Sequence, residues 1–94
     1  GAEHPGDADM VTVHFTGWTS DGRMFDSSRT SGKPASFPLN KVIAGMREGV
    51  KLMTPGETRR FWMPESLTYR GTREPKGPLV FDVELIAFTS VPPD

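Results

Sequence analysis

The amino-acid sequence predicts an α+β fold in which an antiparallel β-sheet packs on one short α-helix. Three observations support this prediction. Several segments alternate apolar and polar residues with a period of two, which is typical of strands with one buried face. A single segment repeats its apolar residues at helical spacing. The length of 94 residues corresponds to one small domain with one hydrophobic core.

The first part of the chain predicts an irregular lead-in followed by two strands. Residues 1–9 hold Pro, Gly and three acidic residues but few apolar ones, so we expect no regular structure there. Residues 10–15 alternate apolar and polar side chains, which predicts a strand that ends at Gly17. An Asp-Gly turn at residues 20–23 then leads into an extended segment at residues 24–26.

The middle of the chain predicts a short edge strand and a helix. Residues 36–39 form the strand, and Pro38 favours an edge position because proline cannot donate a backbone hydrogen bond. Residues 44–53 form the helix candidate. Its apolar residues fall at i, i+4 and i+7 on one face: Met46, Val50 and Met53. Gly45 and Gly49 each weaken this helix by about 1 kcal/mol, so we expect tertiary contacts to stabilise it.

The last part of the chain predicts two strands joined by a turn and a loop. Residues 58–63 alternate, and Trp62 falls on the outward face, where we expect a surface or partner contact. Residues 64–69 form a turn or a single helical turn. Residues 79–88 form the longest strand. Along that strand one set of residues alternates with the set between them: Leu79, Phe81, Val83, Leu85 and Ala87.

The composition argues against several classes of function. The formal net charge is −1 with scattered charges, so we expect neither a nucleic-acid partner nor a membrane surface. The lack of cysteine excludes disulfides and thiolate metal sites. His4 and His14 have no partner at metal-ligand spacing, and no phosphate-binding or nucleophile motif occurs, so we expect no metal and no cofactor.

The expected domain covers residues 10–89, between the lead-in and a linker or tail at residues 90–94. Such ends are typical of a domain from a longer protein. No apolar run reaches the roughly 20 residues that a membrane helix needs. The sequence contains no targeting segment, so the compartment stays open, with the cytoplasm favoured.

A series of short motifs resembles one family. The motifs are residues 13–17 (VHFTG), 21–28 (DGRMFDSS), 42–45 (VIAG), 48–50 (EGV), 55–57 (PGE), 67–69 (LTY) and 79–85 (LVFDVEL). Each motif alone is weakly specific, but their order and spacing resemble the FKBP family of peptidyl-prolyl cis-trans isomerases from residue 10 to about residue 88. The resemblance implies a sheet curled around one short helix, with a proline pocket between them.

The resemblance also implies the roles of eight residues in catalysing rotation about X-Pro peptide bonds and thereby assisting protein folding. The implied catalytic residues are Phe25, Asp26 and Tyr69. The implied substrate-binding residues are Phe15, Val42, Ile43, Met46 and Phe81. In the family pattern, the Ile43 backbone N–H and the Tyr69 hydroxyl donate hydrogen bonds to substrate carbonyls. No metal or cofactor is implied, and the family default is a monomer.

Taken without the resemblance, these residues have more ordinary interpretations. Phe15, Phe25 and Phe81 are core residues of strands, and Tyr69 is a half-buried aromatic beside a turn. Asp26 is a turn-capping residue ahead of two serines. The ordered family match favours the functional interpretation over these.

The sequence departs from the family pattern at several positions. Met46 stands where the family usually has a tryptophan floor, and Ala35 stands where many members have an aromatic residue. Phe15 replaces a tyrosine, and Ser31 replaces an arginine that often pairs with the residue equivalent to Asp26. The loop before the last strand is short, and the family's first strand has no clear counterpart. We therefore expect weaker binding of macrolide inhibitors and low activity.

These departures keep a second class of function open. The alternative to an isomerase is a proline-binding or chaperone-like module that has the fold but little turnover, which Met46, Ala35 and the short loop favour. A spacer domain without a site is a third class, which the combination of Asp26 with an aromatic pocket disfavours.

Overall fold

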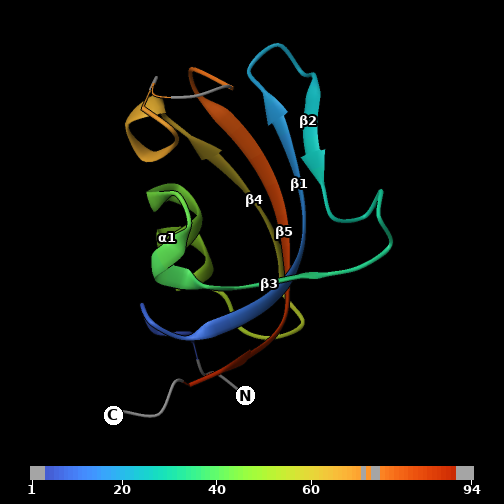
Figure 1. Cartoon of the computed structure of the whole chain (residues 1–94), viewed down its shortest axis with the longest axis vertical. Helices are drawn as coiled ribbons and strands as arrows, with labels where there is room; N and C mark the ends of the chain where they lie inside the picture. The colour runs from blue at the N-terminus through green and yellow to red at the C-terminus, as the bar shows by residue number, and fades with distance from the viewer. Residues whose placement is uncertain (1–3, 71, 73–74, 91–94) are drawn as a thin grey trace.

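The computed structural model describes residues 4–70, 72 and 75–90 of the chain. It shows an antiparallel sheet that curls around one short helix, α1 (Figure 1). In chain order the elements are β1 (Met10–Thr19), β2 (Met24–Ser27), β3 (Ala35–Pro38), the 3-10 turn η1 (Leu39–Lys41), α1 (Ala44–Val50), β4 (Thr58–Met63), the 3-10 turn η2 (Glu65–Leu67) and β5 (Leu79–Thr89). The predicted α+β fold class is confirmed.

Strands β1 and β5 form the centre of the sheet. The strand order is β2-β1-β5-β4, and β3 also pairs with β1. β5 pairs with β1 along the whole of β1, whereas the other edge of β1 is shared between two strands. Met10–Val13 pair with β3 and Thr16–Trp18 pair with β2. Residues 28–34 therefore carry the chain from one part of this edge to the other.

A bulge in β5 interrupts the alternation predicted for this strand. Thr12 pairs with Ala87 and Val13 pairs with Leu85, so Ile86 has no partner in β1. The extra residue shifts the alternation by one position. As a result Phe88 packs against the core and Ala87 is exposed, so the alternation predicted over residues 79–88 does not continue without a break to its end.

Two predicted element ends are also wrong. Strand β1 continues through Gly17 to Thr19, because β2 and β5 pair with Gly17 and Trp18 from both sides. Helix α1 ends at Val50 instead of residue 53. The next residues form a turn, in which the Met53 N–H donates to the Val50 carbonyl at 3.0 Å.

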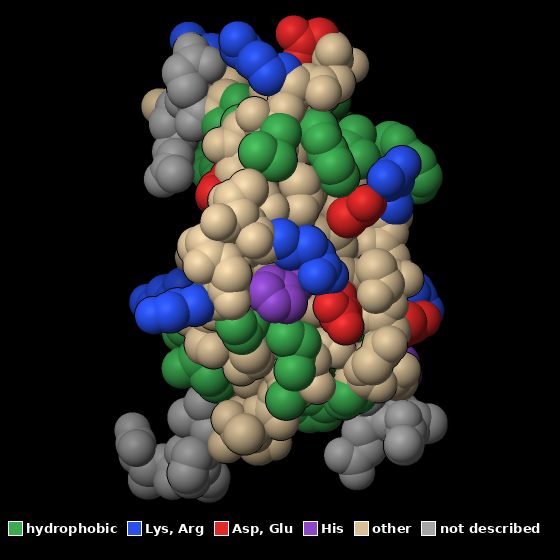
Figure 2. All heavy atoms as spheres, turned by 90° about the vertical axis from the view of Figure 1, so that its right-hand side faces the viewer, with side chains coloured by type: hydrophobic (Ala, Val, Ile, Leu, Met, Phe, Trp, Pro, Cys, Tyr) green, Lys and Arg blue, Asp and Glu red, His purple; other side chains and the backbone are tan. Residues whose placement is uncertain are grey.

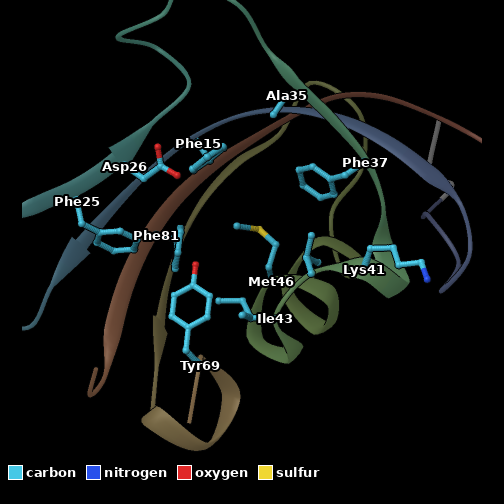
Figure 3. A pocket seen from close by; sticks show the side chains of 11 residues that line it. Phe15, Phe25, Asp26, Ala35, Phe37, Lys41, Ile43, Met46, Tyr69 and Phe81 are labelled. Carbon is cyan, nitrogen blue, oxygen red and sulfur yellow. The ribbon is translucent and has the colours of Figure 1, made fainter. Parts of the chain in front are cut away.

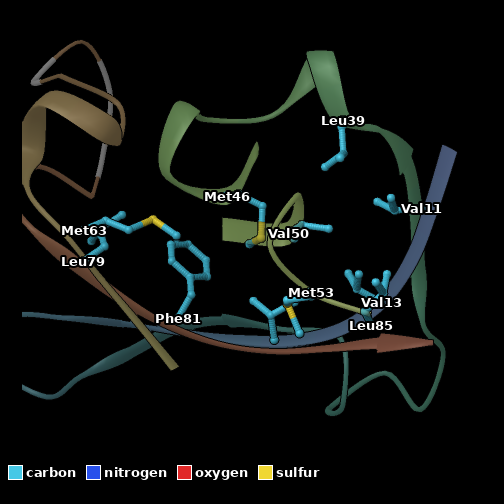
Figure 4. Close-up of a cluster of buried hydrophobic side chains, with 11 residues drawn as sticks. Val11, Val13, Leu39, Met46, Val50, Met53, Met63, Leu79, Phe81 and Leu85 are labelled. Carbon is cyan, nitrogen blue, oxygen red and sulfur yellow. The ribbon is translucent and has the colours of Figure 1, made fainter. Parts of the chain in front are cut away.

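The hydrophobic core lies between α1 and the concave face of the sheet (Figure 4). The fully buried side chains include Val11 and Val13 of β1, Val50 of α1, Met53 and Leu85. These are residues that the alternation and the helical spacing place inward. Their burial supplies the tertiary contacts that a seven-residue helix with two glycines requires.

The two helix glycines allow α1 to lie close to β4. A Cβ atom on Gly49 would come within 2.9 Å of ring atoms of Phe61, and one on Gly45 would come within 2.5 Å of the Met63 sulfur. Real side chains do not approach so closely, so a larger residue at Gly49 would press the helix against the Phe61 ring, and one at Gly45 would require the flexible Met63 side chain to move. The glycines therefore weaken the isolated helix but permit its packing.

Residues 4–9 of the lead-in are irregular, as predicted, and pack on the domain, whereas residues 1–3 lie outside the described residues. Pro5 is buried, and the His4 Nδ1 atom lies 3.0 Å from the Met53 carbonyl oxygen. Asp7 forms an ion pair with Lys51 at 2.7 Å, just after α1. The lead-in thus covers the C-terminal end of the helix.

The outer face of the sheet is mainly polar and carries cross-strand ion pairs. Arg60 of β4 makes two hydrogen bonds to Asp82 of β5, at 2.5 and 2.9 Å, and lies over the Trp18 ring at 5.4 Å. Arg29 pairs with Glu84 at 2.8 Å. Figure 2 shows acidic and basic side chains side by side on the side of the molecule away from α1. None of the helices in the described part is long and apolar enough to cross a membrane.

Candidate functional site

A pocket of about 560 Å³ lies between α1 and the concave side of the sheet (Figure 3). This volume is within the range typical of small-ligand sites. The side chains around it come from β1, β2, β3, η1, α1, β5 and the segment after η2. They are Phe15, Phe25, Asp26, Ala35, Phe37, Lys41, Val42, Ile43, Met46, Tyr69 and Phe81. The structure therefore brings together all eight residues that the sequence indicated.

Three phenylalanines form an aromatic wall centred on Phe81. The Phe25 and Phe81 ring centroids are 5.6 Å apart with the rings perpendicular, and the Phe15 and Phe81 centroids are 6.3 Å apart at 46°. Edge-to-face geometry of this kind is favourable for aromatic pairs. Phe81 is almost fully buried, whereas the other two rings are half-buried and face the opening. The wall combines a rigid base with an accessible surface.

Gly17 makes room for this wall. It pairs with Phe81 of β5 and with Asp26 of β2. A Cβ atom at Gly17 would lie 2.7 Å from the Phe25 ring and 2.8 Å from the Phe81 ring. Any other residue at this position would displace one of the two rings.

A bulge in β2 directs two neighbouring side chains toward the same pocket. Gly17 pairs with Asp26 and Trp18 pairs with Met24, so Phe25 is an extra residue in β2. Neighbours in a regular strand point to opposite faces, but Phe25 and Asp26 both line the pocket. Bulges commonly redirect a side chain in this way beside binding sites.

Asp26 places a carboxylate at the exposed mouth of the pocket. Its Oδ1 atom accepts the Ser27 backbone N–H at 2.9 Å. Within the described ranges no cationic group lies within 4.0 Å of Asp26. Ser31 instead donates its hydroxyl to the Ser28 carbonyl at 2.8 Å. The carboxylate is thus held by the backbone of its own turn and faces the opening.

The start of α1 forms the opposite side of the pocket. Ile43 is the N-cap residue, and its carbonyl accepts the Arg47 N–H at 3.0 Å. The N–H of an N-cap residue takes no part in the helical hydrogen-bond ladder. Met46 is 5% exposed and belongs both to the core and to the pocket floor, at the position where the sequence indicated it.

Tyr69 enters the pocket from the segment that follows η2. The Thr68 hydroxyl donates to the Glu65 carbonyl at 3.0 Å, and the Tyr69 carbonyl accepts the Thr72 N–H at 2.9 Å. Both bonds fix the backbone on either side of the ring. Figure 3 shows the Tyr69 hydroxyl pointing into the pocket, near Phe81 and Ile43.

The sequence analysis missed two lining residues, Phe37 and Lys41. Phe37 had a usable signal, because it shares one face of β3 with Ala35, whose family position lies near the site. Lys41 had no signal, since it belongs to η1, which the sequence pattern did not predict. No cluster of metal-ligating side chains occurs among the residues described here.

Comparisons with known proteins agree with this arrangement. A family model described as FKBP-type peptidyl-prolyl cis-trans isomerase matches residues 1–86. An FKBP-type peptidyl-prolyl cis-trans isomerase FkpA of Aeromonas hydrophila is 48% identical over 87 residues, which are 88% of this chain and 32% of that protein. A macrophage infectivity potentiator of Trypanosoma cruzi is 44% identical over 92 residues, which are 93% of this chain and 47% of that protein.

Solved structures show the same similarity. The crystal structure of FkpA from Escherichia coli matches with a TM-score of 0.90 and 40% identity, covering 98% of this chain and 45% of that one. A peptidyl-prolyl cis-trans isomerase from Pseudomonas syringae matches with a TM-score of 0.84 and 32% identity, covering 96% of this chain and 69% of that one. The chain spans only a third to a half of the two curated relatives named above.

Proposed function

The chain belongs to the FKBP-type peptidyl-prolyl cis-trans isomerase family, and on this basis we propose that its pocket catalyses rotation about X-Pro peptide bonds and so assists protein folding. The observation that carries the proposal is the aromatic wall of Phe15, Phe25 and Phe81 facing Ile43 and Tyr69 across one cavity. The substrates are X-Pro segments of peptides or of incompletely folded proteins.

The apolar wall lowers the barrier by removing water from the peptide bond. Amide resonance creates a rotation barrier of about 18–20 kcal/mol and places partial charges on the carbonyl oxygen and the nitrogen. Water stabilises those charges, whereas a phenylalanine-lined cavity does not. The twisted transition state is less polarised than the planar ground state, so it loses less on transfer into the pocket. Each 1.36 kcal/mol of this difference accelerates rotation about tenfold.

Polar groups at the edge of the pocket hold the substrate while the bond rotates. In the proposal, the Ile43 N–H and the Tyr69 hydroxyl donate to substrate carbonyls, and the Asp26 carboxylate accepts substrate N–H groups. Val42 and Met46 provide the apolar floor next to the helix. No covalent step and no proton transfer is required.

A proline-binding or chaperone-like module with little turnover is the second candidate. The observation that favours it is Met46 at the pocket floor, because a flexible thioether offers no flat surface for a proline ring. Both candidates bind X-Pro segments at the same residues. They differ only in whether bound peptide exchanges faster between cis and trans.

Variants of the pocket test the isomerase proposal in a protease-free isomerisation assay on an X-Leu-Pro-Phe peptide. Phe25→Ala and Asp26→Ala should each lower kcat/KM at least tenfold. Tyr69→Phe should lower it about two- to tenfold, the value of one hydrogen bond. Trp62→Ala is the matched aromatic control, because Trp62 is 72% exposed and does not line the pocket. Equal activity in all four variants would contradict the site assignment.

Macrolide inhibitors and oligomeric state extend the proposal. We expect macrolides of the type that the family binds to occupy this pocket with reduced affinity, because Met46 and Ala35 reduce the aromatic surface. We expect the domain by itself to be a monomer.

A further inference from the structure

The pocket carries one negative and one positive group on different sides of its apolar centre. Asp26 lies at the β2 side, and Lys41 of η1 lies beyond Phe37 on the other side (Figure 3). Phe81 and Met46 lie between them. A peptide bound across the pocket therefore meets charges of opposite sign at its two ends.

Neither charge is neutralised by a neighbour in the described part of the chain. Lys41 and Asp26 have no oppositely charged group within 4.0 Å there. Some other charged residues in the same part are paired, including Arg60 with Asp82 and Lys51 with Asp7. The two charges beside the pocket are thus available to a bound ligand.

The pocket extends beyond the space that one proline ring needs. Its volume of about 560 Å³ is comparable to sites for drug-sized ligands. Phe37 of β3 lies between the centre of the pocket and Lys41 (Figure 3), and Val42, the next residue after Lys41 in the chain, also lines the pocket. Since residues of an extended peptide are spaced by about 3.3–3.6 Å, the residues one or two positions from the proline reach the side of the pocket toward Lys41.

We propose that Lys41 makes the site selective for X-Pro segments with a carboxylate next to the prolyl dipeptide on the η1 side. The inference rests on the isomerase function proposed above and names its substrate class: apolar X-Pro sequences flanked by Asp or Glu. Asp26 repels a carboxylate at the opposite side. The preference is therefore restricted to one side of the proline and is not a general attraction to anions.

The apolar surroundings strengthen this interaction over that of an ordinary surface lysine. Charges separated by water are screened within about 8 Å at physiological ionic strength, whereas a bound peptide displaces water from Phe37 and Val42. Exposed ion pairs contribute about 0.2–1 kcal/mol, which corresponds to a change of about 1.4- to fivefold in affinity. Because the apolar surroundings strengthen the interaction, we expect a selectivity in the upper part of this range, about two- to fivefold.

A peptide series tests the proposal with the protease-free assay. The reference peptide is Ala-Gln-Leu-Pro-Phe-Gln, and each glutamine is replaced in turn by Glu or Lys. For the wild-type domain, Glu on one side of the proline should raise kcat/KM about two- to fivefold over Gln, and Lys there should lower it. Glu on the other side should lower it. In 1 M NaCl the ratio of kcat/KM between the charged and the glutamine peptides should approach one, because the Debye length falls to about 3 Å.

Charge variants identify the residue responsible. Lys41→Glu should invert the Glu-over-Lys preference, and Lys41→Gln should abolish it. Lys33→Glu is the matched control, since Lys33 is exposed, does not line the pocket and undergoes the same charge change. The order of the peptides should be unchanged in that control. The proposal would be overturned if Lys41→Glu kept the wild-type preference for the Glu peptide over the Lys peptide. It would also be overturned if Lys33→Glu inverted this preference in the same way.

The reference peptide separates failure of this inference from failure of the proposed function. If the domain accelerates exchange of the glutamine peptide but shows no dependence on Lys41, only the charge selectivity is wrong. If the domain does not accelerate exchange of any peptide, the isomerase proposal is wrong. In that case the selectivity is measured as the affinity for each peptide by nuclear magnetic resonance titration. The affinities of the Glu, Gln and Lys peptides should follow the order given above, and Lys41→Glu should invert the preference for Glu over Lys. If neither is observed, the charge selectivity is wrong as well.

Discussion

At the residue scale, Gly17 shows how one position without a side chain determines the shape of the pocket. We expect Gly17→Ala to destabilise the domain by about 1–3 kcal/mol, as is typical of overpacking, because the new Cβ would press on Phe25 and Phe81. It should also reduce isomerase activity, since both rings belong to the aromatic wall. Denaturant unfolding and kcat/KM measure the two effects.

Gly6→Ala is the control for that substitution. The nearest atom to a Cβ at Gly6 is an Asp9 carboxylate oxygen at 3.6 Å, an ordinary van der Waals contact. Its free energy of unfolding should stay within about 0.5 kcal/mol of the wild-type value. Equal stability of the two alanine variants would show that the wall tolerates the added methyl group and that Gly17 is not required.

Met46 decides how well the pocket holds a flat ring. Met46→Trp should tighten macrolide binding, because an indole adds a rigid surface at the floor. It should also cost about 1–3 kcal/mol of stability, since Met46 is 5% exposed and already fills its space. Calorimetric titration with a macrolide measures the first effect. Unchanged affinity in a folded variant would indicate that the short loop before β5 limits binding, and not the floor.

Eight of the residues that line the pocket were predictable from the motif series but not from the hydrophobic pattern. Phe15 and Phe81 lie where any inward strand residue would lie, so alternation alone assigns them to the core. The position of Asp26 beside Phe25 depends on a bulge, and alternation would place the two on opposite faces. Lys41 was not predicted at all, because a single 3-10 turn leaves no periodic signal in a sequence.

At the element scale, the packing of α1 on β4 opposes helix propensity. A Gly→Ala change inside a helix usually stabilises it by about 1 kcal/mol. We expect Gly49→Ala to destabilise this domain instead, by about 1–2 kcal/mol, because its Cβ would meet the Phe61 ring at 2.9 Å. Thermal and denaturant unfolding measure whether Gly49→Ala raises or lowers the free energy of unfolding.

A double variant separates propensity from packing. Phe61→Leu removes the ring that the new methyl group would meet, so in that background Gly49→Ala should be neutral or stabilising. If Gly49→Ala stabilises the domain even with Phe61 present, the close approach of α1 to β4 does not constrain this position.

The strands were predicted more accurately than their registers. Residues 58–63 match β4, because alternation and the turn residues on both sides mark its ends. The bulge at Ile86 was not predictable from the sequence. Ile86, Ala87 and Phe88 are all apolar, so the pattern does not show which of them faces the core. The end of β1 was misplaced because a glycine was taken as a stop, whereas here Gly17 provides space for two rings.

At the scale of the whole molecule, ion pairs across the outer face make stability depend on pH. Hydrogen bonding by Arg60 and its charge lower the pKa of Asp82 below the usual value, and Thr54 and Arg59 lower the pKa of Glu57. A lowered carboxyl pKa contributes stability above the unfolded pKa, near 4, and this contribution is lost as pH falls through the folded pKa. The domain should therefore lose stability below about pH 4.

Asp82→Asn tests this dependence. The variant should be less stable than wild type at pH 7, by about 0.2–1 kcal/mol, the range for exposed pairs. The two proteins should converge in stability as pH falls through the lowered pKa of Asp82, because the wild-type carboxyl group then becomes protonated as well. Denaturant unfolding over this pH range measures the difference, and a difference that does not change with pH would contradict the role of the ion pair.

The most direct test of the central claim is cis–trans exchange of an X-Leu-Pro-Phe peptide, followed by nuclear magnetic resonance exchange spectroscopy with the unmodified domain. The same sample reports amide shifts of the protein on peptide addition. The account predicts faster exchange at substoichiometric domain concentration, together with shifts at Phe25, Asp26, Ile43 and Tyr69. Shifts at these residues without faster exchange would contradict it and identify a proline-binding module instead of an isomerase.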